Sequence, residues 1–180
     1  MKATGIVRRI DDLGRVVIPK EIRRTMRIRE GDPLEIFTNK DGEVVFKKYS
    51  PMGELSTFAA QYADVMSRAC GAPVLITDRD RVVAAAGVPR REFLEQRLSP
   101  MLEQAMEDRR SFVATVTETV RFLPVQDSER AAAVCFPILS AGDVIGAVCL
   151  MRPDSGAFPG EGDIKMTQVA AGFLGKQMEE

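Results

Sequence analysis

Arginine residues are concentrated at the start of the chain. The first 29 residues contain nine basic side chains, seven of them arginines, against three acidic ones. A guanidinium group can donate two parallel hydrogen bonds to a phosphate, and it keeps its charge when it is partly buried. The type and density of these residues therefore predict a phosphate-binding surface of the kind that contacts nucleic acid.

Charge is divided unevenly along the 180-residue chain. Lysine and arginine outnumber aspartate and glutamate by 12 to 8 in residues 1–50, whereas the remaining residues contain 13 basic and 18 acidic side chains. The overall net charge of -1 therefore hides a basic segment followed by an acidic one. Together with the chain length, this division predicts two small domains.

The side chains required by several kinds of enzyme are missing from the sequence. The chain has no histidine, which excludes Ser–His and Cys–His pairs and histidine-containing zinc sites. Its three cysteines, Cys70, Cys135 and Cys149, are spaced like neither a metal-binding motif nor a disulfide framework, so we expect a reducing compartment. Any enzyme mechanism would have to use carboxylates, lysine or cysteine. We expect a protein that is not an enzyme and has no catalytic residue, no metal and no cofactor.

The apolar runs of the sequence are short. They reach only about half of the roughly 20 residues that span a bilayer, and the first 12 residues have no signal-peptide apolar region. We therefore expect a cytoplasmic protein that makes no membrane contact.

The first fifty residues follow the order strand, turn, strand, helix, strand, turn, strand. β-Branched residues predict strands at residues 6–10 and 15–18, and Gly14 suits the turn between them. Pro19 favours the start of a short helix over residues 20–26. An Asp-Gly pair within residues 39–42 predicts a hairpin between strands at 34–38 and 43–47.

A domain of this size cannot easily bury enough apolar surface to fold by itself. Apolar side chains also fall on both faces of the strand predicted at residues 6–10, as expected for a strand held between two subunits. We therefore predict a homodimer formed through residues 1–52.

The same residues carry a family resemblance. The run TGIVRRIDDLGRVVIP at residues 4–19, followed by EIRRT at 21–25 and DPLEI at 32–36, resembles the AbrB-type transition-state regulators of spore-forming bacteria. The resemblance implies an interlocked dimer, the swapped-hairpin (looped-hinge) β-barrel, that binds double-stranded DNA through surface arginines. The matching DNA-binding positions are Arg8, Arg9, Arg15, Arg23 and Arg24. Weaker DNA-binding candidates are Lys2, Lys47 and Lys48.

The rest of the chain has the pattern of an α+β domain. Apolar residues recur at helical spacing over residues 54–69, which predicts an amphipathic helix within a linking segment at 53–72. From residue 73 to residue 180, hairpins flanked by helices predict a domain with a mainly antiparallel sheet. Its apolar strands at 131–138 and 144–152, joined by a glycine turn, resemble the central strands of a GAF domain, a small-molecule sensor fold.

The whole chain resembles sporulation regulators in which an AbrB-type domain is fused to a GAF domain. The resemblance implies a nucleoid-associated transcription regulator that acts as activator and repressor of forespore genes. It also implies a homotetramer held together by GAF-domain helices. The expected oligomerisation residues are Leu55, Phe58, Tyr62, Ala170, Phe173 and Leu174. No residue identifies a ligand, so the GAF-like domain either senses an unknown small molecule or serves assembly alone.

Two other functions remain as alternatives. The swapped-hairpin fold also serves antitoxins of toxin–antitoxin pairs, but these usually carry a disordered tail, whereas residues 54–180 have the periodicity of a packed domain. The other alternative is a GAF-type enzyme whose N-terminal module serves only dimerisation. Measuring DNA binding separates this alternative from the regulator.

Overall fold

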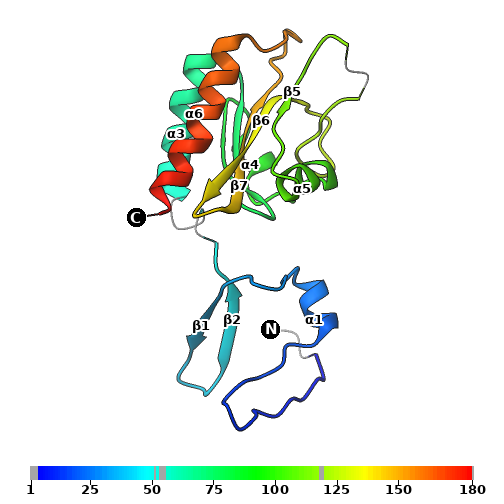
Figure 1. The fold of residues 1–180 in the computed structure, drawn as a ribbon, viewed down its shortest axis with the longest axis vertical. Coiled ribbons are helices and arrows are strands. Elements are labelled where there is room, and N and C mark those ends of the chain that lie inside the picture. Colours follow the sequence, from blue (N-terminus) through cyan, green and yellow to red (C-terminus); the bar gives the residue numbers. More distant parts are fainter. Residues whose placement is uncertain (1–3, 51, 53–55, 118–119, 180) are drawn as a thin grey trace. The chain divides into compact units, whose positions relative to one another are not determined.

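The computed structural model in Figure 1 describes residues 4–50, 52, 56–117 and 120–179. The chain forms two compact units, Met1–Tyr49 and Ser50–Glu180. Each unit has a sheet of its own, with two strands in the first unit and five in the second.

The N-terminal unit contains a short helix and a β-hairpin. Its elements are α1 (Lys20–Thr25), β1 (Leu34–Thr38) and β2 (Val44–Lys48), and the two strands pair antiparallel. At the hairpin turn, the side-chain oxygen of Asn39 accepts hydrogen bonds from the backbone N–H groups of Asp41 and Glu43. Gly42 has a φ of +79°, a left-handed conformation that favours glycine. The hairpin predicted from the Asp-Gly pair is therefore confirmed.

Residues 4–18 form a turn but no strand within the described part of the chain. The backbone N–H of Asp11 donates to the Arg15 carbonyl at 3.0 Å, and the N–H of Gly14 donates to the Asp11 carbonyl at 3.0 Å. The turn predicted at residues 11–14 is therefore present, whereas the strands predicted at 6–10 and 15–18 are not formed. A strand needs a neighbour for its backbone hydrogen bonds, and no described segment of this chain pairs with these two.

The C-terminal unit is an α+β domain built on a five-stranded sheet. Its helices are α3 (Ser56–Cys70), α4 (Arg90–Phe93), α5 (Pro100–Glu107) and α6 (Glu161–Gln177), and its strands are β3 (Val74–Thr77), β4 (Val82–Ala86), β5 (Phe112–Val113), β6 (Ala132–Ser140) and β7 (Asp143–Met151). The strand order is β4-β3-β7-β6-β5, and every neighbouring pair is antiparallel. The predicted α+β class with an antiparallel sheet is confirmed.

The sequence also predicts a helix over residues 90–108, with Ser99-Pro100 as the position of a break, and the structure has two helices there, α4 and α5. Between them, Glu95 has a φ of +65°, which a continuous helix does not allow. The hydroxyl of Ser99 then accepts a hydrogen bond from the backbone N–H of Leu102 at 3.2 Å and caps α5. The cap at Ser99-Pro100 therefore starts α5 at the break that the sequence indicates.

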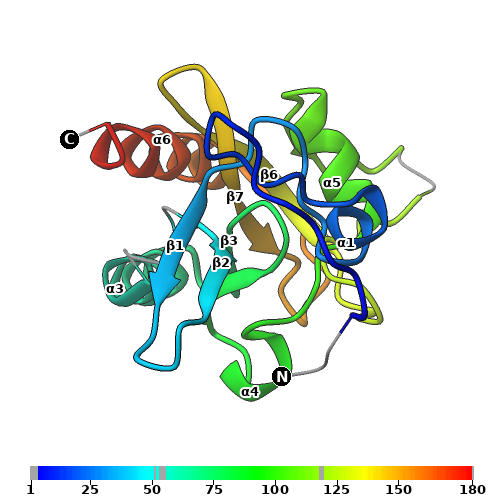
Figure 2. The ribbon, with the colours of Figure 1, turned by 90° about the horizontal axis from the view of Figure 1, so that it is seen from below.

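Helices cover both faces of the sheet (Figures 1 and 2). Helices α3 and α6 lie side by side on one face, and α4 and α5 lie on the other. Val74 and Ile76 of β3 belong to the core on the α3–α6 face, whereas Leu75 between them belongs to the core on the other face. Strands buried on both sides need apolar residues at every position, which explains their unbroken apolar runs.

Two glycines allow backbones to approach closely in this unit. A Cβ atom on Gly175 of α6 would lie 2.0 Å from the carbonyl oxygen of Leu139 in β6. A Cβ atom on Gly146 of β7 would lie 1.9 Å from the carbonyl oxygen of Thr77 in β3. Glycine at these two positions therefore sets how tightly α6 and β3 pack against the central hairpin.

Cys135 of β6 and Cys149 of β7 are directly opposite each other and form a disulfide, with a Cα–Cα distance of 4.4 Å. This corrects the expectation, drawn from their separation of 14 residues, that no disulfide framework is present. The 14-residue separation is explained by the β6–β7 hairpin, because the two cysteines lie at nearly equal distances from its turn at Ala141-Gly142. Counting outward from the predicted turn would have found the pair.

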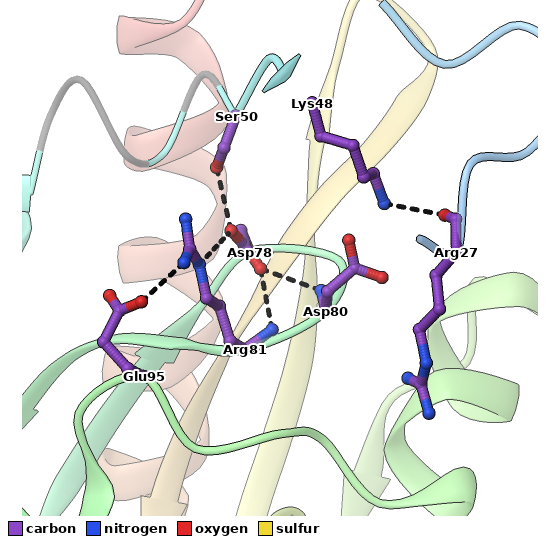
Figure 3. A network of polar contacts seen from close by, with 7 residues as sticks. All are labelled: Arg27, Lys48, Ser50, Asp78, Asp80, Arg81 and Glu95. Atoms are coloured by element: carbon purple, nitrogen blue, oxygen red, sulfur yellow. Dashed lines mark hydrogen bonds and ion pairs between the residues drawn. The ribbon is translucent and has the colours of Figure 1, made fainter. Parts of the chain in front are cut away.

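The turn between β3 and β4 is organised by a buried carboxylate (Figure 3). Asp78, whose exposure is 6%, accepts hydrogen bonds from the backbone N–H groups of Asp80 and Arg81, both at 2.8 Å. Its second oxygen accepts a hydrogen bond from the hydroxyl of Ser50 at 2.9 Å. Arg81 also forms an ion pair with Glu95. Asp78 therefore ties the first residue of the C-terminal unit to its sheet.

Candidate nucleic-acid interface

Four of the five predicted DNA-contacting arginines form no ion pair with any described residue. Arg8, Arg9, Arg23 and Arg24 are exposed, and no described residue forms an ion pair with any of them. Arg8 donates only to the carbonyl of its neighbour Val7, at 3.2 Å. Guanidinium groups that neutralise no internal acid remain available for phosphate.

The fifth, Arg15, is held by an acidic residue of the same turn. Its Nε donates to Oδ2 of Asp11 at 2.8 Å, and its backbone N–H donates to Oδ1 at 2.8 Å. Oδ1 also accepts the backbone N–H of Leu13 at 3.0 Å, while Gly14 supplies a φ of +76°. The Arg15 side chain stays 69% exposed, and its two Nη groups bind no described residue. Asp11 therefore holds Arg15 at the tip of the turn and leaves donors for a partner.

These hydrogen bonds alter the acidity of Asp11. The backbone N–H and then the guanidinium of Arg15 hold the pKa of the Asp11 carboxyl below its usual value, because both stabilise the charged form. Sequence reasoning assigned this residue only to a turn. The signal that could have found its role is the spacing of four residues between the acid and Arg15.

Helix α1 presents Arg23 and Arg24 on an exposed surface. The backbone N–H of Arg23 donates to the carbonyl of Pro19 at 2.9 Å, so the helix begins where proline was expected to start it. Ile22 is half-buried between exposed neighbours and anchors the helix. Met26, four residues after Ile22, is 57% exposed, so one chain by itself does not bury the apolar edge of this helix.

The weaker lysine candidates differ from one another in their surroundings. Lys48 is half-buried and donates to the carbonyl of Arg27 at 3.0 Å (Figure 3). Its ammonium also lies 3.5 Å from the carboxylate of Asp32, which indicates a structural role. Lys47 is exposed, with its ammonium 4.3 Å from the centre of the Phe37 ring. Lys2 lies outside the described residues.

The N-terminal unit has no core of its own. None of the described residues from 4 to 49 is buried. Large apolar side chains are instead exposed along its whole length, at Ile6, Val7, Ile10, Leu13, Val16, Val17, Met26, Ile36, Phe37, Val44 and Phe46. Val7 reaches 84% exposure and Val17 69%. A soluble monomer rarely leaves such a set in water, so these residues require a covering surface.

The expected oligomerisation residues fall into two groups. Phe58 and Tyr62 of α3 and Phe173 of α6 form an aromatic cluster with ring centroids 5.7 to 6.3 Å apart. Phe58 and Tyr62 are half-buried and pack against the core, whereas Phe173 is exposed. Ala170 and Leu174 are 0% exposed and pack into the core of their own subunit, so they are not on a free surface. Leu55 lies outside the described residues.

The described residues contain no group of three or more cysteine, histidine or acidic side chains that could hold a metal ion. Among the helices that the structure describes, none combines the length and the apolar character needed to span a bilayer.

Family models match both parts of the chain. Residues 54–179 match the C-terminal domain of stage V sporulation protein T, described as a transcription factor. Residues 7–53 match the MazE antidote-toxin recognition family of bacterial antitoxins.

Two curated relatives from Bacillus subtilis (strain 168) are similar over these regions. Stage V sporulation protein T is 51% identical over 180 residues, which is 100% of both chains. The transition state regulatory protein AbrB is 59% identical over 51 residues, covering 28% of this chain and 52% of the relative. The resemblance that the N-terminal residues carry is therefore confirmed.

A solved structure supports the fold of the C-terminal unit. The GAF domain/HD domain protein from Geobacter sulfurreducens covers 74% of this chain and 99% of its own, with 15% identity and a TM-score of 0.51. At this identity the likeness concerns the fold alone, and it confirms the predicted GAF-like architecture. With an AbrB-like DNA-binding domain, a GAF-like domain and a relative that matches from end to end, this chain belongs to the stage V sporulation protein T family of transcription factors.

Proposed function

We propose that two copies of the N-terminal unit interweave into one β-barrel and that this dimer binds double-stranded DNA. The absence of any buried residue among the described positions 4–49 carries the proposal. Pairing residues 6–10 and 15–18 with a second copy would supply both missing requirements, backbone partners for the two strands and a cover for the exposed apolar side chains. The predicted swapped-hairpin barrel is the arrangement that does this.

Dimerisation also doubles the cationic surface. Arg8, Arg9, Arg15, Arg23 and Arg24 would appear twice about a two-fold axis, on strand ends and short helices rather than on one long recognition helix. Such a surface contacts phosphates and follows groove shape more than it reads base edges. We infer a sequence-tolerant regulator of sporulation and forespore genes, activating at some sites and repressing at others, located at the nucleoid in the cytoplasm.

A salt titration tests the DNA-binding surface. In the full chain, Arg23→Gln removes one guanidinium per subunit and therefore two phosphate contacts per dimer. The slope of log K against log salt should fall by about 1.8, since each phosphate contact contributes about 0.9. Arg91→Gln is the matched control, because Arg91 is an exposed arginine of the C-terminal unit. An unchanged slope together with an altered preference for one base would refute the assignment of Arg23 to phosphate.

The outer face of α3 and α6 is the surface that we propose for tetramer assembly. Around the Phe58–Tyr62–Phe173 cluster, Val65 is 68% exposed and Val169 is 65% exposed. This apolar area lies on two helices that pack side by side, so another pair of helices could cover it (Figure 1).

Sedimentation of the full chain tests this surface. Val169→Lys should convert a tetramer into a dimer, because a charge would be placed in an apolar contact. Val116→Lys is the control, since Val116 is 79% exposed in a loop away from both helices. A tetramer that survives Val169→Lys would place the assembly surface elsewhere.

The antitoxin alternative receives support from the match of residues 7–53 to an antitoxin family. That match stops before the region that corresponds to a transcription factor, residues 54–179. We therefore favour the regulator. The DNA titration also separates it from an enzyme whose N-terminal unit only dimerises, because such an enzyme would show no salt-dependent DNA affinity.

A further inference from the structure

The C-terminal unit contains a cavity of about 400 Å³ between α3, the edge strand β4 and α4. The backbone of β4 at Ala84 and Ala85 forms part of its lining, together with Ala60 of α3 and Leu94 at the end of α4. The side chains of Ala84 and Ala85 belong to opposite faces of the sheet, so the cavity follows the edge of β4. The volume lies in the range of natural small-molecule sites.

An ion pair forms part of the lining of this cavity. Nη2 of Arg90, at the start of α4, lies 3.1 Å from Oδ1 and 3.0 Å from Oδ2 of Asp64 on α3. Both side chains are partly exposed, at 52% and 40%, so the pair contributes little to stability. Each partner can therefore be released to a ligand at small cost.

The ion pair leaves hydrogen-bonding groups of both Arg90 and Asp64 available. Only one guanidinium nitrogen of Arg90 contacts Asp64, and the remaining N–H groups make no hydrogen bond to a described residue. Asp64 likewise binds no other described side chain. The lining of the cavity therefore provides N–H donors of Arg90 for an anionic group, next to the carboxylate of Asp64 for a cationic group.

We propose that this cavity binds a free α-amino acid with a small apolar side chain. The α-carboxylate binds Arg90, the α-ammonium binds Asp64, and the side chain lies against Ala60 and Leu94 at the edge of β4. The ligand replaces one ion pair with two, so no net charge is buried. This inference stands apart from the proposed DNA-binding function.

The charge pattern selects against other small molecules. A simple carboxylate or a phosphate ester would meet repulsion from Asp64, and a simple amine would meet repulsion from Arg90. A molecule that carries an ammonium and a carboxylate on the same carbon satisfies both residues at once. Beside the ion pair, Ala60 and Leu94 favour an aliphatic side chain over a charged one, and the polar Ser56, Thr57 and Gln61 complete the lining.

Calorimetric titration of the full chain tests the proposal. L-Leucine and L-valine should bind, whereas 4-methylpentanoate and 3-methylbutylamine, which each carry one of the two charges, should bind at least about tenfold more weakly. Arg90→Gln and Asp64→Asn should each weaken leucine binding by about tenfold or more. Arg130→Gln is the matched control, because Arg130 forms a similar exposed ion pair with Asp154, at 3.2 Å, and does not line the cavity.

Amide NMR spectra give a second readout that does not depend on heat. Leucine should shift the backbone amide signals of Ala84 and Ala85, and these shifts should disappear in Arg90→Gln. The proposal is overturned if leucine and valine at about 10 mM, a weak-binding limit, give neither heat nor shifts. It is also overturned if binding survives both substitutions, or if the simple carboxylate binds as tightly as leucine.

The same samples distinguish this result from failure of the proposed function. DNA affinity of each variant, measured without amino acid, should equal that of the parent, because Arg90 and Asp64 lie outside the N-terminal unit. Lost DNA binding in the parent would refute the regulator, whereas absent leucine binding with intact DNA binding would refute only the amino-acid site.

Discussion

Replacing Gly175 by alanine tests how the C-terminal unit is packed. The new methyl group would lie 2.0 Å from the Leu139 carbonyl oxygen, and contacts below 3.4 Å are tighter than nearly all those that Cβ atoms make. Helix α6 and strand β6 must therefore separate by roughly 1.4 Å, the difference between these two distances. The obstacle is backbone, so it cannot turn away as a side chain would.

The free-energy cost of separating α6 from β6 is partly offset by the higher helix propensity of alanine. Overpacking costs about 1–3 kcal/mol, and the backbone obstacle places Gly175→Ala near the upper end. Alanine recovers about 1 kcal/mol in helix propensity relative to glycine. We expect a net loss of about 2 kcal/mol, which corresponds to a fall in Tm of roughly 4–8 °C for a chain of this size.

Thermal unfolding followed by circular dichroism measures the effect, with Gly162→Ala as the control. Gly162 also lies in α6, but a Cβ atom there would meet nothing within 4 Å, so this variant should be as stable as the parent or slightly more stable. Equal melting temperatures for Gly175→Ala and Gly162→Ala would show that the close approach of α6 to β6 is wrong.

Three further predictions follow from the contacts described above. The Arg15 bonds that lower the pKa of Asp11 stabilise the turn above the usual Asp pKa and are lost as pH falls through the lowered value. An NMR titration should show Asp11 titrating below its usual range in the parent. In Arg15→Ala the pKa should rise only part of the way back, because the variant loses the guanidinium bond and keeps the backbone N–H that contributes most. Reducing the Cys135–Cys149 disulfide should lower stability by about 3 kcal/mol, the chain-entropy value for a loop of this length, as measured by urea unfolding with and without dithiothreitol. Asp78→Ala removes the acceptor of three hydrogen bonds in a buried turn and should cost about 2 kcal/mol by the same urea assay, whereas a loss below about 0.5 kcal/mol would contradict the role given to Asp78.

Several features of the site could be predicted because they depend on nearby residues. The Asp-Gly hairpin, the turn that ends in Gly14 and the helix started by Pro19 are each determined within a few residues, and all three are present. The exposure of Arg23 follows from helical spacing in the same way. The role of Asp11 was missed because a turn residue and an arginine-positioning residue have the same local pattern.

Other features depended on contacts that no local pattern contains. The strands expected at residues 6–10 and 15–18 have the right side chains, but strand formation needs a partner, and none lies in the described part of one chain. Ala170 and Leu174 share a helix with the exposed Phe173, and only their packing against the sheet shows that they belong to the core.

By itself, the sequence determined the division of charge, the exclusion of histidine chemistry, the α+β class and the basic N-terminal surface, because each depends on composition or on short-range spacing. Only the tertiary structure decided the close approach permitted by Gly175 and the ion pair of Arg90 with Asp64 beside a cavity. Each of these features brings together residues that are far apart in the sequence. Their distance in space depends on how the helices pack on the sheet, which is fixed only when the whole core is packed.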